Sequence, residues 1–185
     1  MSFSIIINIM NRLIAGNLVT LVSSIGIVLI GFIKSKEKTL FYQTIDYGIM
    51  AIGNSILGGI AGLITNIISI IRNIVCIKYD FNWILKIVFI LAQGIFILIF
   101  NVEGKFGFLP FVAVTIYVLY LDAKDIRKFK ASIPISEIFW VVYDLSILNI
   151  SAAIFDTLTL VSNSYSLYQI VKENKQLNSV TVFTL

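Results

Sequence analysis

The chain has 185 residues, of which 58% are hydrophobic and 13% are charged, with a formal net charge of +4. Its mean hydropathy is +0.97, whereas soluble domains are about 45–50% apolar. Because the apolar residues fall in long runs, this composition excludes a soluble globular domain and predicts an all-α, polytopic membrane protein in a lipid bilayer. The basic residues cluster between the apolar runs, which argues against a nucleic-acid partner.

The residue inventory also limits the chemistry of the chain. It contains no His and a single Cys, Cys76, so the commonest acid–base group and any internal disulfide are excluded. An intramembrane enzyme with paired acids would use Asp46 and Asp144, but neither lies in a motif typical of such enzymes. We therefore expect no enzymatic activity, no cofactor and no metal site.

Taken in chain order, the sequence begins with residues 1–12, whose apolar run is too short to cross a bilayer and is interpreted as an interfacial segment. A spanning helix needs about 20 apolar residues, and seven stretches are candidates. The predicted spans are residues 13–33, 38–54, 55–77, 82–101, 106–122, 134–150 and 152–172. The turns "GNS" (53–55) and "NIS" (149–151) are so short that the helices on either side must be antiparallel.

The basic residues sort to one side of these seven spans. Only Arg12 and Lys105 fall on the other side, and all remaining Lys and Arg share the first. The positive-inside rule makes the basic side cytoplasmic. The sequence therefore predicts an N-terminus outside and a C-terminus in the cytoplasm.

The third and seventh predicted helices resemble each other. At an offset of 97 residues, "LITNIISIIRNIV" (63–75) and "LVSNSYSLYQIV" (160–171) align Leu63 with Leu160, Asn66 with Asn163 and Ser69 with Ser166. We interpret residues 13–77 and 106–172 as two three-helix repeats, joined by a linker helix over 82–101 and followed by a cytoplasmic tail over 173–185. With one linker helix between them, the two repeats run parallel.

Several stretches of the chain support a family resemblance. They are "KSKEKTLFYQ" (34–43), "GGIAGLITN" (58–66), "FLP" (108–110) and "FDTLTLVSNSYSLYQ" (155–169). In this order and spacing the chain resembles the YgjV-type bacterial inner-membrane proteins, and it is distantly similar to the SWEET, PQ-loop and PnuC transporters. The resemblance implies two parallel three-helix bundles around a linker helix, a 3+1+3 plan, in a bacterial inner membrane.

The resemblance also implies positions for a site. Asn66 and Asn163 would face each other across a central substrate pocket, and Pro110 is the one proline placed like a transporter hinge. Pro134 would lie at the start of the sixth helix.

Polar residues inside a membrane usually face the interior of a bundle, which adds further candidates. The predicted substrate-binding residues are Asn66, Asn163, Asp144, Asp156, Ser69, Ser166, Tyr143 and Trp140. Asp144, Asp156 and Asp46 are the candidates for carrying a coupled proton. Tyr47, Tyr165 and Tyr168 are further candidates for stacking on a ligand.

Structural roles are the alternative for each of these residues. The two amides could simply hydrogen-bond neighbouring helices, and the aromatic side chains could pack in the bundle or form an interfacial belt. Arg72 is expected to extend to the cytoplasmic interface.

The predicted function is transport of a small polar or ring-containing solute (a sugar, nucleoside or vitamin) by alternating access, either as a facilitator or coupled to protons. Two alternatives stay open: a substrate-binding membrane subunit of a vitamin uptake complex, and a non-transporting receptor or chaperone on the same fold. A homo-oligomer is compatible with each of these hypotheses.

Overall fold

The computed structural model describes residues 3–122 and 126–182 and is all-helical over these ranges. It contains seven α-helices and one short 3₁₀ segment, η1. The elements are α1 (Phe3–Gly31), α2 (Lys36–Leu57), α3 (Ile60–Lys78), α4 (Trp83–Phe100), η1 (Gly104–Phe108), α5 (Leu109–Tyr120), α6 (Ile126–Ser146) and α7 (Ile150–Val182). Seven helices in this order agree with the sequence prediction.

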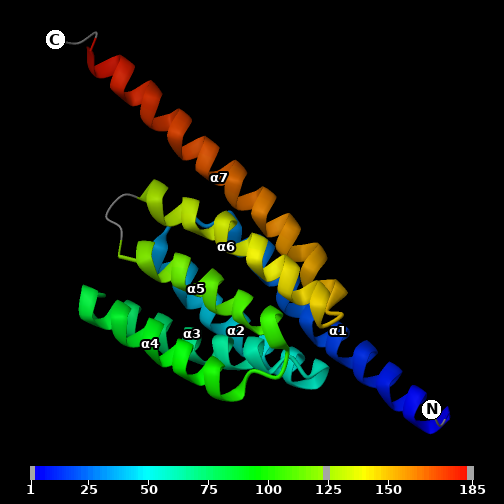
Figure 1. Cartoon of the computed structure of the whole chain (residues 1–185). Coiled ribbons are helices and arrows are strands. Elements are labelled where there is room, and N and C mark those ends of the chain that lie inside the picture. The colour runs from blue at the N-terminus through cyan, green and yellow to red at the C-terminus, as the bar shows by residue number, and fades with distance from the viewer. Residues whose placement is uncertain (1–2, 123–125, 183–185) are drawn as a thin grey trace.

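Successive helices run in alternating directions along one common axis (Figure 1). Around that axis, α1 packs on α2, α2 on α3, α3 on α5, α5 on α6, α6 on α7, and α7 back on α1. Helix α4 contacts only α3 and α5 extensively, so it lies outside this closed ring of six helices. The ring has an interior to which each of its helices can contribute side chains.

The polarity of the described residues is inverted relative to a soluble protein. Large apolar side chains such as Leu18, Val22 and Leu98 are more than half exposed, whereas Asn54, Asn66 and Asp144 are buried. Apolar side chains are stable on the outside of a bundle only where they face lipid, and polar ones are then kept in the bundle interior. This distribution fits a protein embedded in a bilayer.

Three helices are long and apolar enough to cross a membrane. They cover Ser4–Gly31, Ile60–Lys78 and Trp83–Phe100, and a shorter apolar helical stretch covers Gly104–Tyr120. Helices α2, α6 and α7 are less apolar because they carry charged residues at one end as well as buried carboxylates and amides.

The turn between α2 and α3 lies later than the predicted "GNS" turn. Gly53 and Asn54 are inside α2, and the helix ends at Gly58, whose φ of 85° and N–H bonds to the carbonyls of Asn54 and Ser55 form a C-cap. Glycine adopts this left-handed conformation without the strain of a Cβ. Gly53 instead allows a close helix contact, since a Cβ there would lie 2.2 Å from Thr20 Cγ2. The sequence prediction therefore mistook Gly53, which is needed for helix packing, for a turn residue.

Helix α6 starts at Ile126, well before the predicted residue 134, so Pro134 lies inside the helix instead of opening it. Proline lacks an N–H and usually breaks or kinks a helix, which is why the sequence suggested a boundary here. In membrane helices, neighbouring groups commonly compensate for the lost bond. Helices α1 and α7 are also longer than predicted: α1 is continuous from Phe3, and α7 continues to Val182 across part of the predicted tail.

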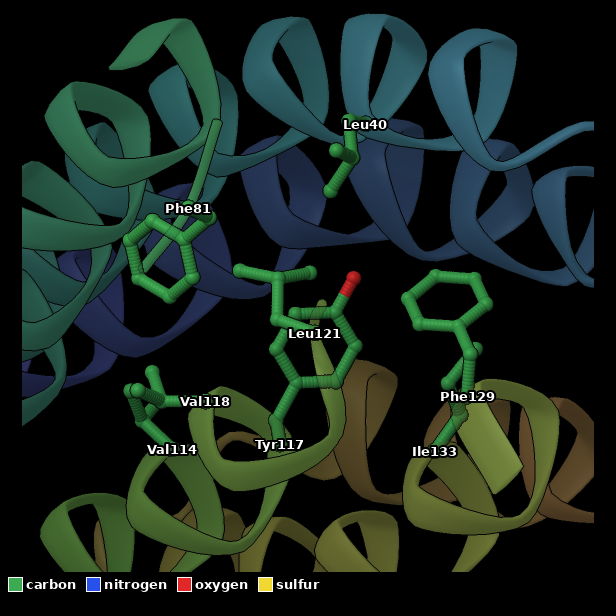
Figure 2. Close-up of a cluster of buried hydrophobic side chains, with 8 residues drawn as sticks. All are labelled: Leu40, Phe81, Val114, Tyr117, Val118, Leu121, Phe129 and Ile133. Carbon is green, nitrogen blue, oxygen red and sulfur yellow. The ribbon is translucent and has the colours of Figure 1, made fainter. Parts of the chain in front are cut away.

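An apolar cluster closes the ring at the end where α5 finishes and α6 begins (Figure 2). It joins Leu40 of α2 and Phe81 of the α3–α4 link to side chains of α5 and α6, and the Tyr117 and Phe129 rings lie 5.7 Å apart. The cluster separates the ring interior from this end of the bundle.

Candidate functional site

A buried cavity of about 40 Å³ lies inside the helix ring. Its lining includes Ile27 of α1, Asn66 of α3 and Asp156 of α7, together with several residues each from α2, α5 and α6. Helix α4 contributes none of the lining. The cavity is thus built by all six ring helices, three from each predicted repeat.

Four carboxyl side chains line this cavity: Asp46, Glu137, Asp144 and Asp156. All four are buried. Glu137 is an addition to the sequence-predicted site. It precedes Trp140 and Asp144 on α6 by three and seven residues, and that spacing places all three on one helix face. The predicted helix start at residue 134 put Glu137 in the first turn of the span, whereas it lies in the middle of α6.

The carboxyls are held by specific partners. The Ser23 hydroxyl donates to Asp46 Oδ1 at 2.7 Å, and Asn149 Nδ2 donates to Asp144 Oδ1 at 3.2 Å. The side chains of Asp144 and Asp156 are hydrogen-bonded to each other. Such a bond needs a proton between the two oxygens, because ionised carboxylates only accept. The structure thus brings two of the sequence-predicted acids, one from α6 and one from α7, next to each other.

Asn66 of α3 lines the same cavity and is 1% exposed. Its Nδ2 has no hydrogen-bond partner. Ser69, one turn further along α3, is also buried with an unpartnered hydroxyl. A buried donor without a partner costs about 1–3 kcal/mol, so a ligand that accepts from Asn66 would recover this free energy.

Asn163 of α7 is equally buried but lines an adjacent, smaller pocket that is too tightly packed to hold a water molecule. Its Nδ2 donates to the Thr159 carbonyl at 3.0 Å, and its Oδ1 is unpartnered. The two pockets share Ile27, Gln43 and Ile133 as lining. Both predicted amides therefore face the ring interior, in neighbouring compartments. Ser166 is likewise buried, with an unpartnered hydroxyl.

Of the two predicted aromatic site residues on α6, Trp140 lines the cavity, whereas Tyr143 lies outside its lining, at the start of α3. The Tyr143 hydroxyl accepts the Gly62 N–H at 2.8 Å and lies 3.4 Å from Glu103 Oε1. Trp140 lines the cavity and meets Tyr143 edge to face. Pro110 is buried at the start of α5, where its carbonyl accepts from Gln93 of α4 at 3.4 Å.

Two sequence expectations are wrong. Arg72 does not extend to an interface: it is 1% exposed, its guanidinium lies 4.8 Å from the Tyr117 ring centre, and it donates to the Asn73 side chain. An inward-facing position on α3 leaves it no path to water. Tyr165 and Tyr168 are 54% and 62% exposed on α7 and point away from the cavity. They lie on the helix face opposite Asn163 and Ser166.

Comparison with known proteins now adds to this geometry. Residues 14–174 match the model of the Imp-YgjV family, described as bacterial inner membrane protein. The chain belongs to this family. No curated protein and no solved structure matched it. Membership of the Imp-YgjV family agrees with the apolar exterior and identifies the chain as a membrane protein of a bacterial inner-membrane family, in contact with lipid.

Proposed function

We propose that this Imp-YgjV chain carries a small polar solute across the inner membrane by alternating access, acting as a transporter and not as an enzyme. The observation that supports this most directly is the cavity itself, because all six ring helices line it and α4 does not. A site between two three-helix units is where rocking of one unit against the other would expose a solute to either side. In this proposal α4 serves as the linker of a 3+1+3 plan.

The closures at the two ends of the cavity support the same proposal. At one end lie the apolar cluster and the buried Arg72 over Tyr117. At the other, Tyr143 and Glu103 bind N–H groups in the first turn of α3, with Glu103 Oε1 3.1 Å from Ala61 N. In alternating access, opening one closure while the other holds would admit the solute from one side at a time. We place the N-terminus outside and the C-terminus in the cytoplasm.

Four unpartnered polar atoms support a path for the solute. Asn66 Nδ2, Ser69 Oγ, Asn163 Oδ1 and Ser166 Oγ are all buried and lack partners. A structural role for these side chains would normally use their hydrogen-bonding groups, since buried polar groups are usually satisfied. We infer that solute groups satisfy them in turn as the units move. Pro110 lies at the start of α5, where a hinge would let its unit rock.

Proton coupling is the mode of energy use that the site favours. In this proposal the neighbouring Asp144 and Asp156 share a transported proton, and Asp46 and Glu137 line the same cavity from α2 and α6. Uptake should then depend on external pH, and the Asp156→Asn variant should lose that dependence. Retention of an unchanged pH response by a folded Asp156→Asn variant would contradict the role of this pair.

Flux through the purified chain in proteoliposomes tests the proposal. A mixture of labelled sugars, nucleosides, vitamins and small amines is offered, and uptake is compared for the wild type and an Asn66→Ala, Asn163→Ala double variant. We expect uptake of at least one solute by the wild type and its loss in the double variant. Asn11→Ala, which removes an exposed amide of α1, should leave uptake unchanged.

Two results would contradict transport. Saturable binding without flux would favour the receptor or uptake-subunit alternatives, and co-purification with an ATPase would then identify the second. Flux that is unaffected by the double variant in a folded protein would remove the amides from the solute path.

A further inference from the structure

The charge of the central cavity is strongly one-sided. Four carboxyl groups line it, and its lining contains no Lys or Arg. Each of these carboxyls either holds a proton or needs a cation beside it, and the one buried guanidinium nearby, that of Arg72, lies over Tyr117 of the lining and contacts none of the four. Uncompensated buried charge is costly, so a mobile cation, either a proton or a solute, is the natural occupant.

A second observation indicates more than a proton. Asn66 Nδ2 lines the cavity, is 1% exposed and has no partner. A proton on a carboxyl would leave this donor unsatisfied. Water in the empty cavity can accept from this donor, and an occupant that displaces the water must supply an acceptor oxygen or nitrogen in its place, beside its positive charge.

The remaining lining agrees with a cationic group. Tyr47, Tyr117 and Trp140 supply aromatic side chains to the cavity wall. Aromatic faces attract ammonium groups, although Arg72 already lies against the ring of Tyr117. Arg72 lies beside the Tyr47 hydroxyl as well, so Trp140 is the ring of the lining that can face a bound cation.

The volume limits the size of the occupant. A cavity of about 40 Å³ holds about three water molecules when each needs about 10–15 Å³. A ligand of roughly four non-hydrogen atoms is the largest that fits the cavity without rearrangement of its walls.

We propose that the central cavity binds a small organic ammonium ion bearing a hydroxyl or carbonyl oxygen, with its charge among Glu137, Asp46 and the Asp144–Asp156 pair and its oxygen accepting from Asn66. This inference names the solute class of the transport site and rests on the proposed function for its biological meaning. The binding itself can be tested without transport.

Three probes of matched size test the contributions of the positive charge and of the oxygen separately. Ethanolamine carries both groups, ethylene glycol lacks the charge, and propylammonium lacks the oxygen. Binding of each to the full-length protein in nanodiscs is measured by calorimetry at pH 7. We expect ethanolamine to bind most tightly and each of the other probes about tenfold more weakly, since each loses one charge-assisted or direct hydrogen-bonded contact.

Variants then assign each end to a residue. Glu137→Gln should weaken ethanolamine and propylammonium about equally while leaving ethylene glycol unchanged. Asn66→Leu should abolish the advantage of ethanolamine over propylammonium. The three-probe series on the wild type needs no variant, so it decides the question even where a substitution prevents folding.

Equal binding of ethylene glycol and ethanolamine, or no binding of any ammonium probe, would overturn the cation inference. In that event, flux of a neutral solute that depends on Asn66 would leave the proposed transport function standing. If neither ammonium binding nor any Asn66-dependent flux is found, both the cation inference and the proposed transport function are wrong.

Discussion

Helices α3 and α7 carry the same polar positions but use them differently. Asn66 and Asn163 are both 1% exposed, yet Asn66 presents a free N–H to the central cavity, whereas Asn163 presents a free oxygen to the adjacent pocket. The difference arises because Asn163 donates to the Thr159 carbonyl of its own helix. Matching residues in two similar helices thus leave opposite hydrogen-bonding groups without a partner.

The neighbours of the two amides explain this difference. Asn163 is covered by Gly31 of α1: a Cβ on Gly31 would lie 2.9 Å from Asn163 Nδ2 and 2.4 Å from Ser162 Oγ. Asn66 has no such cover and borders the cavity. Close packing of α1 on α7 therefore decides which amide can reach a ligand in the central cavity.

The largest effect should come from breaking that packing. Gly31→Val would push α7 away from α1, and overpacking of this kind costs about 1–3 kcal/mol. We expect a clearly lower thermal unfolding midpoint for the purified protein. Gly48→Val is the matched control, since a Cβ on Gly48 has nothing within 4 Å. Equal midpoints for the two variants would show that the α1–α7 contact is looser than the structure indicates.

The starts of α3 and α7 differ as well. The first turn of α7 is bound by Asn149 and by Asn17 of α1, whereas the Gly62 N–H of α3 depends on Tyr143 of α6. Tyr143→Phe would leave that N–H without its acceptor, at a cost of about 1 kcal/mol. We expect this loss as a lower thermal unfolding midpoint of the variant. Tyr120→Phe, at a half-exposed site on α5, is the control.

Protease accessibility of the α2–α3 turn gives a second readout for Tyr143→Phe. If Tyr143 closes this end of the cavity, cleavage near Gly58 and Gly59 should increase in the variant. An unchanged cleavage rate together with an unchanged melting midpoint would show that Tyr143 does not close this end of the cavity.

The smallest effect should come from the amides themselves. Asn163→Leu removes a bond inside the membrane, where such bonds contribute roughly 0.6 kcal/mol on average. Asn66→Leu removes an amide whose Nδ2 has no partner, so we expect it to be neutral or slightly stabilising without ligand. Thermal unfolding of both variants side by side measures the difference. A larger loss for Asn66→Leu than for Asn163→Leu would mean that Asn66 is a structural residue.

Several features of the fold were predictable from the sequence, and the misses have local causes. The number and order of helices follow from the long apolar runs, because a bilayer requires them. The turn after α2 was misplaced because Gly53 serves packing against Thr20, while Gly58 forms the cap. The start of α6 was misplaced because Pro134 is accommodated within the helix.

The candidate site was also predicted only in part. Asn66, Asp46, Asp144, Asp156 and Trp140 were candidates from the sequence because polar groups in membrane segments are rare, and all of them line the cavity. Glu137 was missed because it lay near a misplaced helix start. The inward position of Arg72 was missed because a basic residue near a helix end normally reaches water.

Composition and apolar run length by themselves determined that this chain is a helical membrane protein, and its residue pattern was sufficient to indicate its family. These properties depend on the free energy of transferring each segment from water to lipid, which does not depend on the other segments. Only the tertiary structure decided that four carboxyls share one cavity and that Asn66 reaches it while Asn163 borders a separate pocket. Such facts depend on the rotation and close approach of helices distant in sequence, which small residues such as Gly31 permit.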